Sequence, residues 1–383
     1  MNKITRKSFL KVLAATMVGG AAASALTGAA APVSIDETNG KVSRWVKNSL
    51  NPDGPLTIAK QGMFSSGGTV TAPVAGTYDA TTNWLDTTRA GNTAHVDHAN
   101  VLYQIPADSN GWPMVYLHGY GQSRMGWITT PDGRQGWADL FLRNGYSAFL
   151  VDQPRRGEAG STAQMSTDGF LDAWSADSKD YKPGDQAWYT HFRIGRVAPE
   201  RYEGSQFPEG DAAQNQFFRQ MTPNTGDFDQ AVAAAALGEV MKDVQTLTGH
   251  KSIFVTHSQG GAVGWDVPAD NIAAIVAIEP GGTPAIGSEQ YTKLLRAGIP
   301  IAIYFGDYID NGPEDIMSTS FWRQVRDGAL AFAAQYNADG GDCTVVDLPK
   351  IGITGNSHFM FQELNNKEIA DHIYQWLESR ALA

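Results

Sequence analysis

The stretch IFVTHSQGGAVG, residues 253–264, determines how the rest of the chain is interpreted. A run of β-branched and aromatic residues ends abruptly at Ser258, and two glycines follow at positions 260 and 261. This pattern predicts a buried strand that turns sharply into a helix. Ser258 then has two interpretations. It is either a reactive serine on a strained turn or an ordinary serine that caps the helix.

Strand and helix patterns alternate over most of the chain. Strands are expected at 100–106, 112–121, 146–157, 252–258, 272–282, 299–309 and 343–349, and helices at 136–145, 227–247, 288–298, 314–337 and 365–381. The alternation predicts an α/β fold, a mostly parallel sheet wrapped by helices on both faces. In such sheets the ligand crevice lies outside the carboxyl ends of the strands. Polar residues expected at these ends are Ser258, His118, Asp152, Glu279 and Asp307.

A serine hydroxyl needs a base and an oriented carboxylate to become a nucleophile. His358 lies in a glycine-rich loop after the last strand, 100 residues beyond Ser258, and is the expected base. The HGYG stretch at 118–121 is typical of loops that stabilise an oxyanion through backbone amides. The amides of Tyr120 and Gln259 are the expected pair. His118 itself is expected to pack or bond within its loop.

Three carboxylates compete for the role of triad acid. Asp307 and Asp310 follow the strand after which the acid most often lies, and Glu279 ends the preceding strand in the sequence IEPGG. These residues alone leave the choice open.

Several longer blocks resemble the secreted carboxylesterase family of α/β hydrolases, which uses a Ser–Glu–His triad. They are WITTPDGRQGWADLFLRNGYSAFLVDQPRRG, HSQGG, AIVAIEPGG, IYFGDYID and GNSHFMFQELNNKEIADHIYQWL, and the resemblance spans about residues 62–380. It implies an α/β-hydrolase fold with Glu279 as the acid. The family's characterised type carries paired cysteines after the oxyanion His-Gly, where this chain has Tyr120 and Gly121, so substrate preference does not carry over.

The chain is expected to consist of an export signal, residues 1–31, and one hydrolase domain, residues 32–383. The first segment pairs a cationic start with a small-residue apolar stretch, and TRKSFLK at 5–11 is similar to a twin-arginine signal with Lys in place of the second Arg. A bacterial-type signal predicts a periplasmic or extracellular location. Residues 157–226 interrupt the alternation with many aromatic residues, and a lid over the site is predicted there.

Composition excludes some functions. The net charge of −11 and the absence of a basic stripe argue against nucleic-acid binding, and the apolar start is too weak for a stable membrane anchor. The only cysteine, Cys343, is expected to be buried in a strand. His95 and His98 lack a third ligand, so no metal is expected. Arg155 and Arg156 are expected to form structural ion pairs.

The sequence therefore predicts an exported serine hydrolase that cleaves carboxylic esters through an acyl-enzyme. No cofactor is expected, and the partners are a small-molecule ester substrate and, as an open alternative, a second copy in a homodimer. Two other functions remain open. The same triad could hydrolyse lactones or amides, or the chain could be a non-catalytic secreted binding protein on a hydrolase scaffold.

Overall fold

A computed structural model describes residues 54–72, 75–78, 81, 90–91, 93–160, 185–222 and 225–383. Its central feature is an eight-stranded sheet in the order β1-β4-β6-β5-β7-β8-β9-β10. The strands are β1 (Ile58–Ser66), β4 (Ala99–Pro106), β5 (Pro113–Leu117), β6 (Ser147–Asp152), β7 (Ser252–His257), β8 (Ile272–Ile278), β9 (Ile301–Phe305) and β10 (Cys343–Asp347). β1 pairs antiparallel with β4, and β4 pairs antiparallel with β6. All other neighbours in the sheet are parallel.

Every residue of β5, β6, β7 and β9 is buried. A strand that is buried on both faces reads as a continuous apolar run because helices cover the sheet from both sides. These runs are the ones that marked the strands in the sequence. The predicted α/β fold, a mostly parallel sheet wrapped by helices, is confirmed.

The helices follow the strands along the chain. They are α3 (Met125–Ile128), α4 (Trp137–Arg143), α5 (Asp185–His191), α6 (Asp211–Arg219), α7 (Gln230–Thr248), α8 (Gln259–Gly264), α9 (Glu289–Ala297), α10 (Met317–Ala338) and α11 (Asn366–Glu378). Short 3-10 turns are η1 (Ala269–Asn271), η2 (Leu348–Ile351) and η3 (Met360–Gln362). The Asp229 carboxylate caps α7 by accepting from the amides of Ala231 and Val232.

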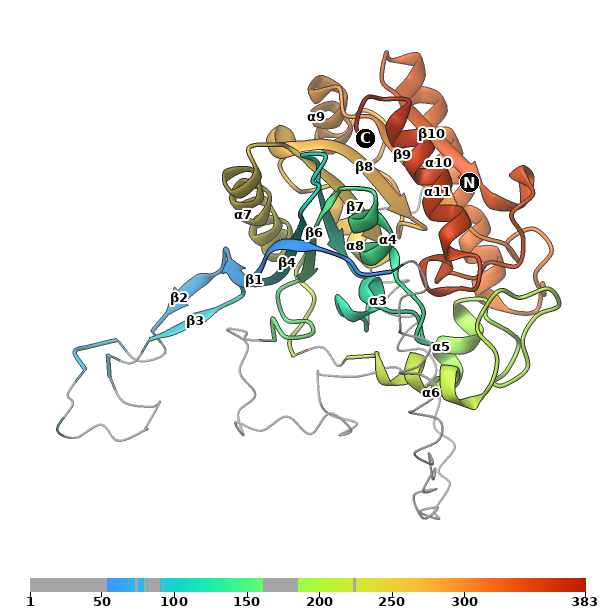
Figure 1. The fold of residues 1–383 in the computed structure, drawn as a ribbon, viewed down its shortest axis with the longest axis horizontal. Helices are drawn as coiled ribbons and strands as arrows, with labels where there is room; N and C mark the ends of the chain where they lie inside the picture. The colour runs from blue at the N-terminus through green and yellow to red at the C-terminus, as the bar shows by residue number, and fades with distance from the viewer. Residues whose placement is uncertain are drawn as a thin grey trace.

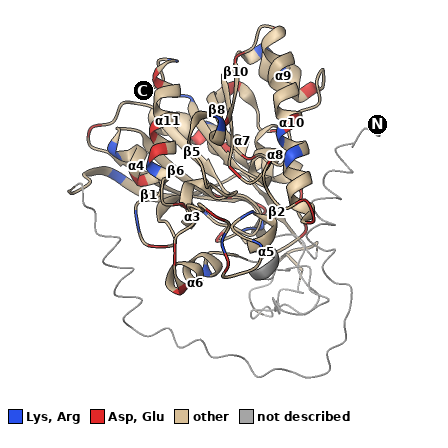
Figure 2. Ribbon diagram, turned by 90° about the vertical axis from the view of Figure 1, so that its right-hand side faces the viewer, with Lys and Arg blue, Asp and Glu red and all other residues tan. Residues whose placement is uncertain are grey.

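Two segments stand apart from the sheet and its helices. β2 (Thr69–Thr71) and β3 (Ala94–Val96) pair as a ribbon that projects from the body (Figure 1). Helices α5 and α6 lie together at one end of the molecule in both ribbon views (Figures 1 and 2). These two helices belong to the predicted insertion, of which residues 157–160, 185–222 and 225–226 are described.

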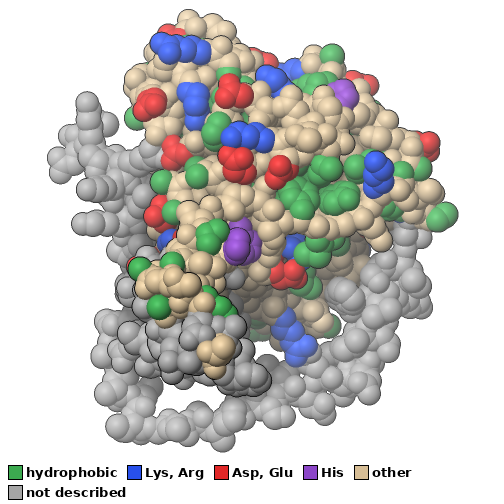
Figure 3. Space-filling model, turned by 90° about the vertical axis from the view of Figure 1, so that its left-hand side faces the viewer, with side chains coloured by type: hydrophobic (Ala, Val, Ile, Leu, Met, Phe, Trp, Pro, Cys, Tyr) green, Lys and Arg blue, Asp and Glu red, His purple; other side chains and the backbone are tan. Residues whose placement is uncertain are grey.

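The surface mixes charges of both signs. Figure 2 shows acidic and basic residues interspersed on the helices, and pairs such as Lys367–Asp371 on α11 join them. On the face in Figure 3, apolar side chains occur in small groups between charged ones. Within the described ranges, no helix has both the length and the apolar character needed to cross a membrane.

Candidate active site

Ser258 lies between the end of β7 and the start of α8, with φ 52° and ψ −118°. A positive φ is unusual for a residue with a side chain and costs about 1–3 kcal/mol, so it persists only where the surroundings enforce it. Here the Ser258 amide donates to Ile278 O, and the amides of Gly261 and Gly281 donate to Ser258 O, each bond about 3 Å long. Although Ser258 occupies the cap position of α8, its side chain makes no capping hydrogen bond. The turn therefore fits a strained serine rather than a helix cap.

Glycines make room for this turn. A Cβ atom at Gly260 would lie 2.4 Å from His118 O, and one at Gly119 would lie 2.9 Å from Ser258 Cβ. Thr256 stands where the common motif has glycine, and it fits because α8 faces it with glycines. A Cβ at Gly264 would lie 3.1 Å from Thr256 Cγ2. The departure from the motif is thus compensated by the glycine that ends α8.

His358 and Glu279 form a buried pair. His358 Nδ1 lies 2.6 Å from Glu279 Oε2, and both side chains are at most 1% exposed. Burial lowers the pKa of His358, although the hydrogen bond to Glu279 acts in the opposite direction. The imidazole is therefore neutral near pH 7. With its Nδ1 proton donated to Glu279, the other ring nitrogen, Nε2, is left as an acceptor, and it has no hydrogen-bond partner among the described residues.

Glu279 follows β8 with a φ of 39° and is ionised. Burial works to raise its pKa, but the positive charge of Arg193 and the hydrogen bond from His358 outweigh burial and lower the pKa to about 2. The second oxygen, Oε1, accepts from the Gly306 amide at 2.7 Å and from Arg193 Nη2. A buried carboxylate held in this way keeps its charge beside the histidine.

The side chains of the two rival carboxylates have other partners than His358. Asp307 accepts from the amides of Tyr308 and Gly355, at 2.7 and 2.9 Å, so it shapes the loop that carries His358. Asp310 is 60% exposed and pairs with Arg326. In the structure, Glu279 is the one of the three that contacts His358.

The loop that carries His358 has further buried support. His257 Nε2 lies 3.0 Å from His358 O, and the two rings have centroids 4.3 Å apart. Burial lowers the pKa of His257 well below its usual range, and the nearby His358 acts in the same direction. Glu363 accepts from the Ser357 amide and the Asn356 side chain. Burial raises the pKa of Glu363 to about 7 against these hydrogen bonds.

The expected oxyanion loop follows β5 and passes directly against Ser258, since Gly119 leaves no space for a side chain there. His118 Nδ1 lies 2.8 Å from Gly119 O, and its Nε2 lies 3.6 Å from Asp152. Burial lowers the pKa of His118, and its contact with Gly119 O is the bonding within the loop that was expected. Tyr120 follows in the same loop, and Gln259 is the first residue of α8.

Aromatic residues of the insertion contact this site. Phe192 stacks on His358 with ring centroids 4.6 Å apart, and Trp188 lies 6.0 Å from the Tyr120 ring. Trp322 of α10 packs on His358 at 4.4 Å. Two other aromatic residues of the predicted insertion, Trp174 and Tyr181, fall outside the described residues. The export segment, residues 1–31, falls outside them as well.

The remaining sequence-based expectations concern structural residues. Cys343 is buried in β10, as expected, and burial raises the pKa of its thiol to about 12. Arg155 forms a structural ion pair with Asp97 through two hydrogen bonds. His95 lies on β3 and His98 just before β4. No group of three metal-binding side chains occurs in the part of the chain that the structure describes.

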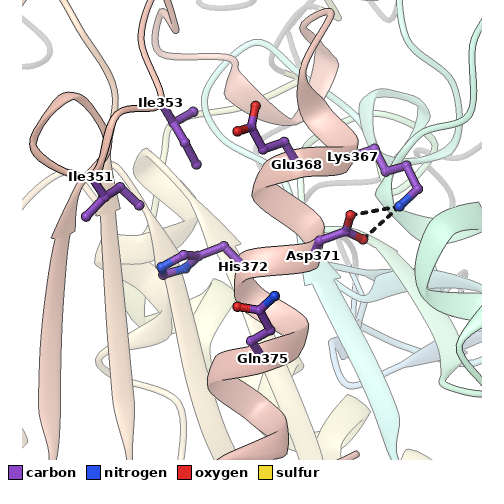
Figure 4. A pocket seen from close by; sticks show the side chains of 7 residues that line it. All are labelled: Ile351, Ile353, Lys367, Glu368, Asp371, His372 and Gln375. Atoms are coloured by element: carbon purple, nitrogen blue, oxygen red, sulfur yellow. Dashed lines mark hydrogen bonds and ion pairs between the residues drawn. The ribbon is translucent and has the colours of Figure 1, made fainter.

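A hollow of about 510 Å³ lies elsewhere, between the loop after β10 and α11 (Figure 4). It is lined by Ile351, Ile353, Lys367, Glu368, Asp371, His372 and Gln375. Among these residues, Lys367 and Asp371 form an ion pair along α11. None of the candidate site residues lines this hollow, so it does not belong to the candidate site.

Sequence reasoning missed Arg193, His257 and Glu363. Each of these polar side chains is almost fully buried. Arg193 lies in the irregular insertion, and nothing in that stretch points to a partner 86 residues away. A signal for His257 was present, since it directly precedes Ser258 at the end of β7.

The comparisons with known proteins point to an esterase. No protein-family model matches the chain. A fungal protein, the probable secreted lipase phiG of Fungal sp. (strain ATCC 74256), is 27% identical over 314 residues, which cover 70% of this chain and 82% of the relative. A bacterial esterase solved at atomic resolution is 31% identical, with a TM-score of 0.71 over 87% of this chain and 99% of that one. The chain therefore belongs to the α/β-hydrolase esterase family represented by that bacterial enzyme, and it is an esterase-type hydrolase.

Proposed function

We propose that the protein is an exported serine esterase that cleaves carboxylic esters through an acyl-enzyme. Ser258 attacks the ester carbonyl, and His358 Nε2 takes its proton and returns it to the leaving alcohol. Glu279 holds the His358 ring and stabilises the imidazolium that forms. The amides of Tyr120 and Gln259 bind the oxyanion. Water then attacks the acyl-enzyme by the same route, and the scheme needs no cofactor.

The observation that carries this proposal is the buried hydrogen bond between His358 Nδ1 and Glu279 Oε2, 2.6 Å long. It fixes the tautomer in which Nε2 is the basic atom. Because burial lowers the pKa of His358, the base is unprotonated at neutral pH. Ser258 supports the same role, since a strained conformation without a capping bond has no evident structural purpose.

We also propose that the insertion acts as a lid that lines an apolar pocket for the acyl or alcohol group. Support comes from Trp188 and Phe192, which pack on Tyr120 and His358. Aromatic side chains are well suited to bind the apolar part of an ester. The proposal of export is supported by the composition of residues 1–31 and by the description of the fungal relative as secreted.

The test combines a fluorophosphonate probe with a screen of substrates. The probe should label the wild-type protein on Ser258. p-Nitrophenyl esters of graded chain length should be hydrolysed faster than matched lactones and amides. An unlabelled protein without turnover would instead be a binding protein on the same scaffold. A labelled protein that prefers lactones or amides would keep the triad and change the substrate class.

A further inference from the structure

Arg193 brings a positive charge from the insertion to the centre of the site. It follows α5 with a φ of 62° and is 1% exposed. Its Nη2 donates to Glu279 Oε1, and its Nε donates to Asp307 O at 3.0 Å. The guanidinium lies over the Trp322 ring, 5.4 Å from the centroid. Arg193 therefore joins the loops that follow β8 and β9.

The two oxygens of Glu279 have different partners. Oε1 accepts from Arg193 and from the Gly306 amide, whereas Oε2 faces His358 Nδ1. Holding one oxygen from two directions fixes the plane of the carboxylate. The other oxygen, Oε2, is then directed at His358 Nδ1.

Phe192, the residue before Arg193, contacts His358. The Phe192 carbonyl accepts from the His358 amide at 3.1 Å, and the Phe192 ring stacks on the imidazole with an interplanar angle of 14°. Two consecutive residues of the insertion thus contact both His358 and Glu279.

We infer that Arg193 is a positioning residue for ester hydrolysis, which aligns the Glu279 carboxylate with His358 and makes the insertion a part of the acid–base apparatus. This inference rests on the function proposed above. It assigns to the insertion a role beyond covering the substrate. A reaction that uses His358 then requires the insertion to be docked through Arg193.

The charged groups around His358 and Glu279 determine how the loss of Arg193 would change the pKa values of these two residues. Arg193 lowers the pKa of both Glu279 and His358. The other titratable groups near the pair are His257, Asp307 and Glu363. Burial keeps His257 neutral, and the Asp307 carboxylate is engaged by loop amides. Glu363 lies close enough to interact with Glu279 by charge. Arg193 is therefore the cation in direct contact with the acid.

A purely structural role for Arg193 predicts something different. A buried arginine that only fills space would lower the amount of folded protein when replaced, and each folded molecule would work normally. The experiment must therefore count active sites. Fluorophosphonate titration gives the concentration of competent Ser258, and kcat is expressed per labelled site.

The variants are Arg193→Met, Arg193→Gln and Arg193→Lys, with Arg326→Met as the matched control. Arg326 is also a buried arginine, but it lies on α10 and pairs with Asp310 and Asp347. R193M and R193Q should lower kcat per site by about 10- to 100-fold, less than the loss of a triad carboxylate itself. KM should change little, because Arg193 acts on the acid and not on the ester.

The pH dependence of kcat/KM distinguishes a positioning role of Arg193 from a purely structural one. Without the nearby positive charge, protonated His358 is favoured, so the acidic limb of kcat/KM should move up by about one pH unit in R193M and R193Q. R193K keeps the charge and should keep the limb near its wild-type position. R326M should keep both the limb and kcat per site.

The possible results distinguish a failure of the proposed function from a failure of the role of Arg193. A wild-type protein that is neither labelled nor active removes the proposed function itself. If the wild type is active, but R193M and R193Q keep the wild-type kcat per site and the wild-type acidic limb of kcat/KM, only the role of Arg193 is overturned. If neither neutral variant folds, Arg193 is assigned to the stability of the fold, and the inference is overturned as well.

Discussion

His358 and Glu279 meet although their strands are not neighbours in the sheet. Glu279 follows β8 and His358 follows β10, and β9 lies between them. The glutamate reaches across the end of β9, where Gly306 donates its amide to Oε1. A Cβ atom at Gly306 would lie 3.1 Å from that oxygen and 2.6 Å from Asn356 O. The path of the acid over β9 therefore depends on a residue without a side chain.

Gly306→Ala should lower kcat by at least about tenfold and destabilise the fold by roughly 1–3 kcal/mol, as overpacking does. The added methyl group has to displace the Asn356 and Ser357 carbonyls, and with them the His358 loop. Gly328→Ala is the control, because a Cβ there meets nothing within 4 Å and the site lies inside α10. A wild-type kcat in Gly306→Ala would show that the placement of Glu279 does not depend on the absence of a side chain at Gly306.

Ser258→Ala should lower kcat by about 10⁶-fold, the usual cost of removing a triad nucleophile. The fold should survive, since the Ser258 side chain makes no capping bond. Turnover of p-nitrophenyl acetate and circular dichroism measure the two effects. More than a tenth of the wild-type rate would rule out Ser258 as the nucleophile.

Glu279→Gln should lower kcat by about 10⁴-fold, because an amide neither stabilises the imidazolium nor fixes the tautomer. Asp307→Asn should have a much smaller effect on the rate, since Asp307 bonds the Tyr308 and Gly355 amides rather than His358. Steady-state kinetics of both variants decide between them. The reverse order of effects would place the acid after β9.

Trp188→Ala should change the preference for acyl chain length more than it changes kcat on the shortest ester. Trp188 packs against Tyr120 and Phe359 beside the site. Tyr189→Phe is the control on the same helix, because Tyr189 packs on Phe207 and its hydroxyl donates to Pro199 O. Equal chain-length profiles in wild type and Trp188→Ala would contradict a lid that lines the pocket.

Stability should depend on pH through Glu363. Its folded pKa of about 7 exceeds the ordinary value of 4.5, so the folded chain keeps a proton that the unfolded chain has lost. This carboxyl group therefore makes stability fall as pH rises from about 4.5 to 7. Glu363→Gln should show a smaller decrease in its urea midpoint between pH 5 and pH 8. A steeper decrease in the variant would contradict a protonated Glu363.

Glu279 should act in the opposite sense and in a lower window. Its folded pKa of about 2 lies below the ordinary 4.5. The stability that it contributes is present above about pH 4.5 and is lost as pH falls towards 2. The two carboxyl groups near the His358 loop therefore titrate in separate ranges, and the decrease in urea midpoint below pH 4.5 should be smaller in Glu279→Gln than in the wild type.

The sequence was sufficient for the α/β fold because buried parallel strands are nearly continuous apolar runs. The same positions placed Ser258, Glu279 and His358 at the carboxyl end of the sheet. The choice of Glu279 over Asp307 came from the family resemblance. Spacing alone does not show that Gly306 leaves space for a longer side chain to cross β9.

Other features depend on tertiary structure and left no local pattern. The ion pair of Arg193 joins the insertion to a strand end 86 residues later. Burial of Glu363 follows from how the His358 loop packs, and a single glutamate in the sequence gives no sign of it. Thr256 in place of the usual glycine is explained only once the glycines of α8 are seen to face it.

Arg193, Ser258 and Glu279 all have positive φ, at 62°, 52° and 39°. Such backbone favours glycine, and at Ser258, whose side chain makes no capping bond, a glycine would relax the chain while removing the functional group. Laboratory evolution of this esterase under heat alone would therefore tend to accumulate inactive survivors. A screen for heat tolerance should score hydrolysis in every round, so that the three residues are retained while stabilising changes accumulate elsewhere.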